Sequence, residues 1–120
     1  MKLLSLALAG TTLLIASTFA NASDLAAGKA TWEKINCASC HGADAKSPIL
    51  PEYPVLAGQH ADYLAHALKA YQRGAHEAPT TANGRKNAVM GAFAVQLSSQ
   101  DISNVTAWLA SMPGPLSVHK

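Results

Sequence analysis

The chain has few cysteines, few aromatic residues and few charged residues. Two cysteines among 120 residues allow one disulfide at most, which excludes a small scaffold held together by disulfides. Charged residues make up only 13% of the chain and form no long block of one sign, a composition that argues against disorder. The net charge of +2 comes without a basic stripe, so we expect no nucleic-acid partner. A chain of this length is one domain and is too short for a TIM barrel.

The first 22 residues predict a cleaved signal peptide. Lys2 precedes a mostly apolar stretch at residues 3–15, and Ala20-Asn21-Ala22 is a small-residue cleavage site. A membrane-spanning anchor would need about 18 consecutive apolar residues, whereas Ser5 and Gly10 interrupt this stretch. We therefore expect export to the periplasm, an oxidising compartment, and a mature chain without a membrane anchor.

The mature chain, residues 23–120, predicts an all-α domain. Apolar residues recur every three or four positions in three segments, which is the spacing of helices that bury one face. The expected helices cover Asp24–Asn36, His60–Arg73 and Ser99–Ser111, and a short helix around Lys86–Ala94 is compatible with the pattern. No alternating pattern predicts a strand.

Residues that favour helix ends mark these segments. Ser98 is a good N-cap, Asp101 suits the positive end of the helix that follows, and Met112-Pro113-Gly114 predicts its end. Gly74 is expected to lie just beyond the second helix, as its C′ residue. Three prolines exclude a helix from Ser47–Gly58. Loops this long are uncommon in a compact domain unless they are functional or enclose something.

The motif Cys37-Ala38-Ser39-Cys40-His41 predicts what the loops enclose. C-x-x-C-H is the signature of c-type haem attachment. Two cysteines at this spacing near a helix end lie on one side of the backbone and can form thioethers with both vinyl groups of one porphyrin. His41 then directs its imidazole at the iron. One covalently attached haem c would complete the small core of an exported protein.

Three other interpretations of the motif compete with haem attachment. A thioredoxin-like redox pair normally follows a strand of a βαβ unit, and no strand pattern precedes Cys37. A structural zinc site needs four ligands, and neither a second C-x-x-C nor an H-x₃₋₅-H pair completes one. A plain disulfide between Cys37 and Cys40 would leave the adjacent histidine without a role. The histidine, the export signal and the helical pattern together favour haem.

Met90 is the predicted second axial ligand of the iron. It lies among small residues in the segment 84–97, expected to be mostly a loop, where a thioether can approach the iron without crowding. Methionine–histidine ligation is a recognised haem arrangement that raises the reduction potential. Met112 lies on the apolar face of the last helix and is expected to fill the core. The remaining histidines are interpreted as surface residues: His60, His66, His76 and His119.

With these residues in place, the chain resembles a class I c-type cytochrome, closest to cytochrome c553 proteins and to one half of a dihaem cytochrome c4. The stretches that carry the resemblance are Cys37–Asp44, Tyr53–His60, Tyr63-Leu64, Leu68, Gly84–Lys86, Met90, Leu97-Ser98 and Asp101-Ile102. The resemblance implies the class I cytochrome c fold, with three to four helices around one haem. Its first and last helices would cross nearly at right angles, with Gly28 and Trp32 meeting Val105 and Trp108.

The resemblance implies a non-enzymatic, one-electron carrier between an electron donor and an acceptor, and we expect a monomer. A proline carbonyl should accept a hydrogen bond from Nδ1 of His41; Pro48 is favoured over Pro51 and Pro54. Two alternatives stay open. The chain could be a dedicated cytochrome subunit of a periplasmic dehydrogenase or terminal oxidase complex. It could also be a haem enzyme or gas sensor with an open sixth site, for which His76 and Arg85 are the available loop residues.

Overall fold

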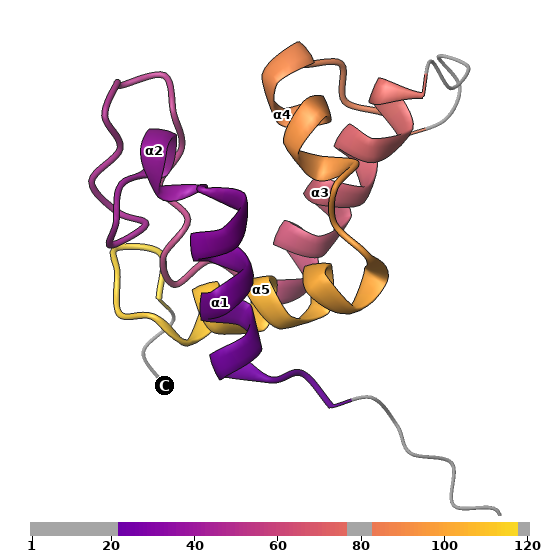
Figure 1. The fold of residues 1–120 in the computed structure, drawn as a ribbon. Coiled ribbons are helices and arrows are strands. Elements are labelled where there is room, and N and C mark those ends of the chain that lie inside the picture. The colour runs from indigo at the N-terminus through magenta and orange to yellow at the C-terminus, as the bar shows by residue number, and fades with distance from the viewer. Residues whose placement is uncertain (1–21, 77–82, 118–120) are drawn as a thin grey trace, which may run out of the picture.

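The computed structural model describes residues 22–76 and 83–117, which form helices and connecting loops without a strand (Figure 1). The helices are α1 (Leu25–Ile35), α2 (Ala38–His41), α3 (Ala61–Ala75), α4 (Ala88–Ala94) and α5 (Ser99–Ser111). The all-α prediction is confirmed. Nearly all of the expected signal peptide lies outside the described residues. Within them, no helix has both the length and the apolar character that crossing a membrane requires.

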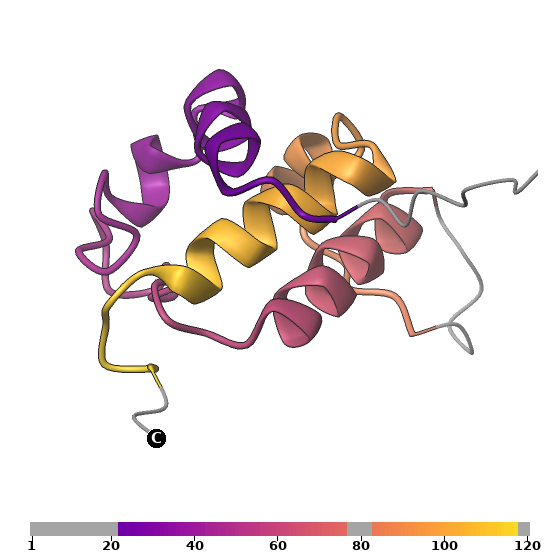
Figure 2. The same cartoon turned by 90° about the horizontal axis from the view of Figure 1, so that it is seen from below.

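Helices α1 and α5, the first and the last of the described helices, cross in close contact (Figures 1 and 2). A Cβ atom at Gly28 would overlap the carbonyl oxygen of Asn104 and would lie 2.7 Å from the Cβ of Trp108. The rings of Trp32 and Trp108 are 5.6 Å apart, and Trp32 shares the buried core with Val105. The predicted contact between these two helices is confirmed, and it depends on the absence of a side chain at Gly28.

Helix α5 has the predicted bounds because both of its ends are fixed by the sequence. The Ser98 hydroxyl accepts a hydrogen bond from the Asp101 backbone N–H, and the Asp101 carboxylate accepts one from the Ser98 backbone N–H. The hydrogen bond from the Ser98 hydroxyl is the main cause of a lowered pKa of Asp101. Met112 has extended backbone and ends the helix before Pro113.

Helix α3 is longer than predicted, and the expectation that Gly74 ends it is wrong. The helix continues to Ala75, so Gly74 lies within it. A Cβ atom at Gly74 would overlap the carbonyl oxygen of Arg85, and the Arg85 N–H donates to the Ala70 carbonyl oxygen at 2.9 Å. The absence of a side chain at Gly74 therefore allows the segment 83–87 to approach α3 closely, and the glycine does not terminate the helix.

The short helix α4 also forms, so Met90 lies on a helix and not in the loop expected for most of residues 84–97. The Asn87 side chain caps α4 by accepting a hydrogen bond from the Met90 N–H at 2.9 Å. Gly91 allows α4 to pack closely on α3, because a Cβ there would be 3.1 Å from the Cβ of Ala75. Figure 1 shows α4 beside α3, in agreement with the contact between the two helices.

The loop between α2 and α3 contains no helix, as its prolines predict, and is fixed by a buried turn. The Ala45 side chain is fully buried, and its carbonyl oxygen accepts hydrogen bonds from the Leu56 and Ala57 N–H groups at 2.8 and 3.0 Å. The Asp44 carboxylate stabilises the turn by accepting from the Lys46 and Ser47 N–H groups. The segment 53–57 is thereby drawn back towards α2.

Candidate functional site

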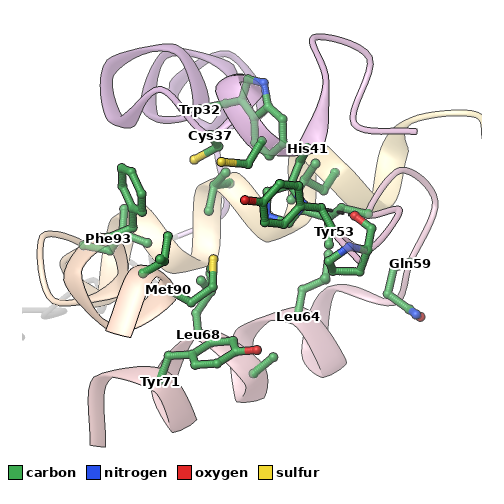
Figure 3. A pocket seen from close by; sticks show the side chains of 18 of the residues that line it. Trp32, Cys37, His41, Tyr53, Gln59, Leu64, Leu68, Tyr71, Met90 and Phe93 are labelled. Carbon is green, nitrogen blue, oxygen red and sulfur yellow. Dashed lines mark hydrogen bonds between the residues drawn. The ribbon is translucent and has the colours of Figure 1, made fainter. Parts of the chain in front are cut away.

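A largely apolar cavity of about 420 Å³ lies between α1, α2, the segment 52–59, α3 and α4 (Figure 3). A volume of this size is within the range of small-molecule and cofactor sites, about 300–1,000 Å³. All four residues predicted to bind haem line this cavity: Cys37, Cys40, His41 and Met90.

The two cysteines lie at opposite ends of the single turn of α2. Cys37 is the residue before the helix, and its carbonyl oxygen accepts the His41 N–H at 3.1 Å, which closes the turn. Both thiols are free and half-buried, and both line the cavity. Burial raises the pKa of the Cys37 thiol to about 11. At neutral pH this thiol is protonated and is a weak nucleophile.

His41 is buried at the end of α2, and a hydrogen bond at one ring nitrogen fixes the orientation of its imidazole. Nδ1 lies 3.0 Å from the Pro54 carbonyl oxygen. A carbonyl oxygen only accepts, so Nδ1 must carry the proton and donate it. In the neutral ring, Nε2 then keeps its lone pair and is available as a metal ligand. The rings of Trp32 and Tyr53 flank the imidazole at centroid distances of 6.2 and 6.3 Å.

A proline carbonyl accepts this hydrogen bond, as expected, but the preference for Pro48 over Pro54 is wrong, because the loop turns in a different place. Ile49 follows Pro48, and its N–H donates to the Cys40 carbonyl oxygen at 3.1 Å. That bond holds the Pro48 segment against the backbone of α2, and the carbonyl oxygen beside Nδ1 belongs to Pro54. Pro54 instead lies in the segment 53–57, which the hydrogen bonds to the Ala45 carbonyl oxygen draw back towards α2.

Met90 occupies the other side of the cavity. Its side chain extends from α4 towards the space that Cys37 and His41 face from α2 (Figure 3). Met112 does not line the cavity and packs against the buried core, as predicted. Histidines other than His41 are absent from the described lining: His60, His66 and His76 are exposed, and His119 lies outside the described residues.

Aromatic residues of the cavity were missed as functional candidates. The Arg85 guanidinium lies over the rings of Tyr63 and Tyr71, at 5.7 and 5.6 Å from their centroids, and all three residues line the cavity. Tyr71 belongs to the apolar stripe that predicted α3. Helical periodicity identifies such a face, but it does not distinguish a face that packs on protein from one that lines a cavity.

Residues 25–113 match the family model of cytochrome c. This chain belongs to the cytochrome c family. The family carries covalently attached haem c, and its members are electron carriers rather than enzymes. Membership decides in favour of haem over the dithiol, zinc and disulfide interpretations of C-x-x-C-H.

Individual cytochromes are similar over most of the chain. Cytochrome c-554(548) of Halomonas halodenitrificans is 38% identical over 91 residues, which are 75% of this chain and 98% of that protein. A protein named thiosulfate dehydrogenase electron acceptor, of Stutzerimonas stutzeri, is 34% identical over 119 residues, 96% of this chain but 51% of that protein.

A solved cytochrome c structure agrees with the helical architecture. The reduced recombinant cytochrome c4 of Pseudomonas stutzeri superposes with a TM-score of 0.67 at 34% identity, over 78% of this chain and 47% of that one. The class I cytochrome c fold is thus confirmed. The chain spans nearly the whole of the c-554 protein but about half of the other two relatives.

Proposed function

We propose that this chain is a monohaem electron carrier whose haem c is held by Cys37 and Cys40 through thioether bonds. His41 and Met90 would be the side chains that hold its iron, His41 through Nε2 and Met90 through its thioether sulfur. The observation that carries the proposal is the convergence of two thiols, an imidazole with a free Nε2 and a thioether on one apolar cavity.

The chemistry of the cavity fits this group. The two thiols project from one helical turn, which suits attachment to one side of a ring. Trp32 also lines the cavity, and its Nε1 is buried and has no hydrogen-bond partner among the described residues. Arg85 provides a cation at the tyrosine-lined part of the cavity, where a carboxylate of the group would be neutralised.

The bound haem supplies a one-electron Fe(III)/Fe(II) couple. The protein's part is to hold both axial side chains in place, so that little rearranges during transfer. Pro54 fixes the tautomer and orientation of His41, as hydrogen-bond partners of metal ligands commonly do. The apolar lining excludes water, and the neutral thioether of Met90 favours the reduced state; both raise the potential.

We also propose that residues 1–22 direct export and that the carrier operates in the periplasm. Haem attachment and redox partners would then both be periplasmic. Fractionation of the native host, followed by N-terminal sequencing, tests this directly. A periplasmic protein that begins at Ser23 supports the proposal, and a cytoplasmic protein that retains Met1 refutes it.

The test of the ligand set is the visible spectrum of the haem-loaded protein, oxidised and then reduced. Wild type and Met112→Ala should both be low-spin and bind carbon monoxide poorly, whereas Met90→Ala should lose the methionine–iron(III) charge-transfer band. A wild type that is high-spin and binds carbon monoxide readily would instead indicate the enzyme or sensor alternative with an open sixth site.

A second candidate is a dedicated cytochrome subunit of a periplasmic dehydrogenase or oxidase complex. The similarity to the protein named thiosulfate dehydrogenase electron acceptor favours it. Size-exclusion chromatography of the periplasmic fraction separates the two candidates. Elution of the haem absorbance at the mass of one chain supports the free carrier, and elution within a stable larger complex supports the subunit.

A further inference from the structure

Helix α4, which carries Met90, depends on α3 for its position. It has only seven residues, and isolated helices shorter than about 12–15 residues are marginal in water. Among the described helices, α3 is its main packing partner. Gly91 and Ala94 are the buried residues of the helix and have little or no side chain, while Val89 and Val95, the residue that follows the helix, are 53% and 43% exposed, so burial of apolar surface contributes little there. Specific ties to α3 must therefore hold α4 in place.

The residues that precede α4 and the residues at its C-terminal end are bound to α3 in different ways. At the entry, the Arg85 N–H donates to Ala70, and Gly74 allows the two backbones to touch. At the exit, the tie is one side chain of α3. The Gln72 Nε2 group donates to the carbonyl oxygens of Ala94 and Leu97, each at 2.9 Å. Both acceptors are backbone carbonyls, so the amide NH₂, and not its oxygen, must face them.

We propose that Gln72 is a positioning residue for Met90: its amide clamps the exit of α4 and so keeps the thioether directed into the cavity. The proposal rests on the proposed role of Met90 as an axial ligand. Gln72 is half-buried and does not line the cavity itself, so it acts through α4. Without the clamp, α4 would open locally more often, and a local opening need not unfold the domain.

The clamp has a measurable consequence for an external ligand of the iron. Imidazole can bind only while Met90 is displaced, so its apparent dissociation constant is the intrinsic one divided by the displaced fraction. Gln72→Leu keeps the bulk of the side chain but removes both hydrogen bonds. Two neutral hydrogen bonds of ordinary strength correspond to a rise in that fraction on the order of 10- to 100-fold. Imidazole should bind the oxidised variant more tightly by the same factor.

Two control variants separate positioning from general destabilisation. Gln96→Ala removes a glutamine that donates to Ala92 within the α4 segment and makes no tie to α3. Asp24→Ala removes the N-cap of α1, which lies far from α4 in the sequence. It should lower the free energy of unfolding of the whole domain by about as much as an ordinary N-cap contributes. Both should leave imidazole binding within about twofold of the wild type if local opening of α4 controls access.

The decisive experiment titrates imidazole into these oxidised, haem-loaded proteins and records amide hydrogen exchange at Gly91 and Val95. The proposal expects tighter imidazole binding and faster exchange in α4 for Gln72→Leu alone, with exchange in α5 unchanged. Equal binding in Gln72→Leu and the wild type would overturn it, as would equally tightened binding in Asp24→Ala. If the wild type itself shows no methionine ligation, the proposed ligand set fails first, and the two failures are thus distinguishable.

Discussion

Substitution of Gly28 by alanine tests how tightly α1 and α5 cross. The new Cβ would overlap the Asn104 carbonyl oxygen and lie 2.7 Å from the Trp108 Cβ. Alanine gains about 1 kcal/mol of helix propensity over glycine. Overpacking costs typically 1–3 kcal/mol, and separating the Trp32 and Trp108 rings forfeits about 0.5–1.5 kcal/mol more. We expect a net loss of about 1–3 kcal/mol.

Thermal unfolding of the haem-loaded protein, followed by circular dichroism, measures this loss. For a domain of this size, 1 kcal/mol lowers Tm by about 4–8 °C. Gly91→Ala is the matched control, because it makes the same chemical change within a helix at a less crowded place. Its Cβ would meet one side-chain atom, the Ala75 Cβ, at 3.1 Å, and a shift of a few tenths of an ångström between α4 and α3 relieves that contact, whereas the Cβ at position 28 would overlap a backbone carbonyl. A Gly28→Ala protein as stable as Gly91→Ala would refute the argument that a side chain at this crossing is excluded.

Three further substitutions have definite expected outcomes. Asp101→Asn should destabilise the protein at about pH 7, and the difference should shrink by about pH 3 in urea unfolding. The reason is that folding lowers the pKa of the Asp101 carboxyl. The ionised carboxyl therefore stabilises the folded protein when the pH is above the ordinary pKa, 3.8, and this stabilisation is lost as the pH falls through the lowered pKa. Cys40→Ala should leave haem attached through Cys37 alone, seen as a red-shifted reduced pyridine spectrum; an unshifted spectrum would contradict attachment at Cys40. Met112→Leu should keep the wild-type visible spectrum and change the free energy of unfolding by less than about 1.5 kcal/mol.

The sequence predicted the long helices well because local chemistry determines them. Ser98 and Asp101 cap α5 through bonds between residues three apart, and Pro113 prevents its continuation, so its bounds needed no tertiary information. Gly74 shows the limit of such reasoning. A glycine near the end of a helix predicts a stop, but this one is required by a backbone 11 positions further along, at Arg85.

The candidate site was predictable where it depends on spacing along the chain. Cys37, Cys40 and His41 are adjacent in the motif, and Met90 was selected by its small neighbours. The partner of His41 was not predictable, because Pro54 reaches the ring only through the hydrogen bonds that Ala45 makes with the returning segment. The Arg85 contact with two tyrosines joins residues far apart in sequence and left no local pattern to detect.

Binding of Met90 to the haem iron can be measured in an NMR spectrum of the reduced protein with isotopically labelled methionine methyl groups. A methyl group held against the face of a porphyrin is strongly shielded by the ring current. We expect one methyl signal far upfield, present in Met112→Leu and absent in Met90→Ala. No upfield methyl signal in the wild type, or one that persists in Met90→Ala, would contradict it.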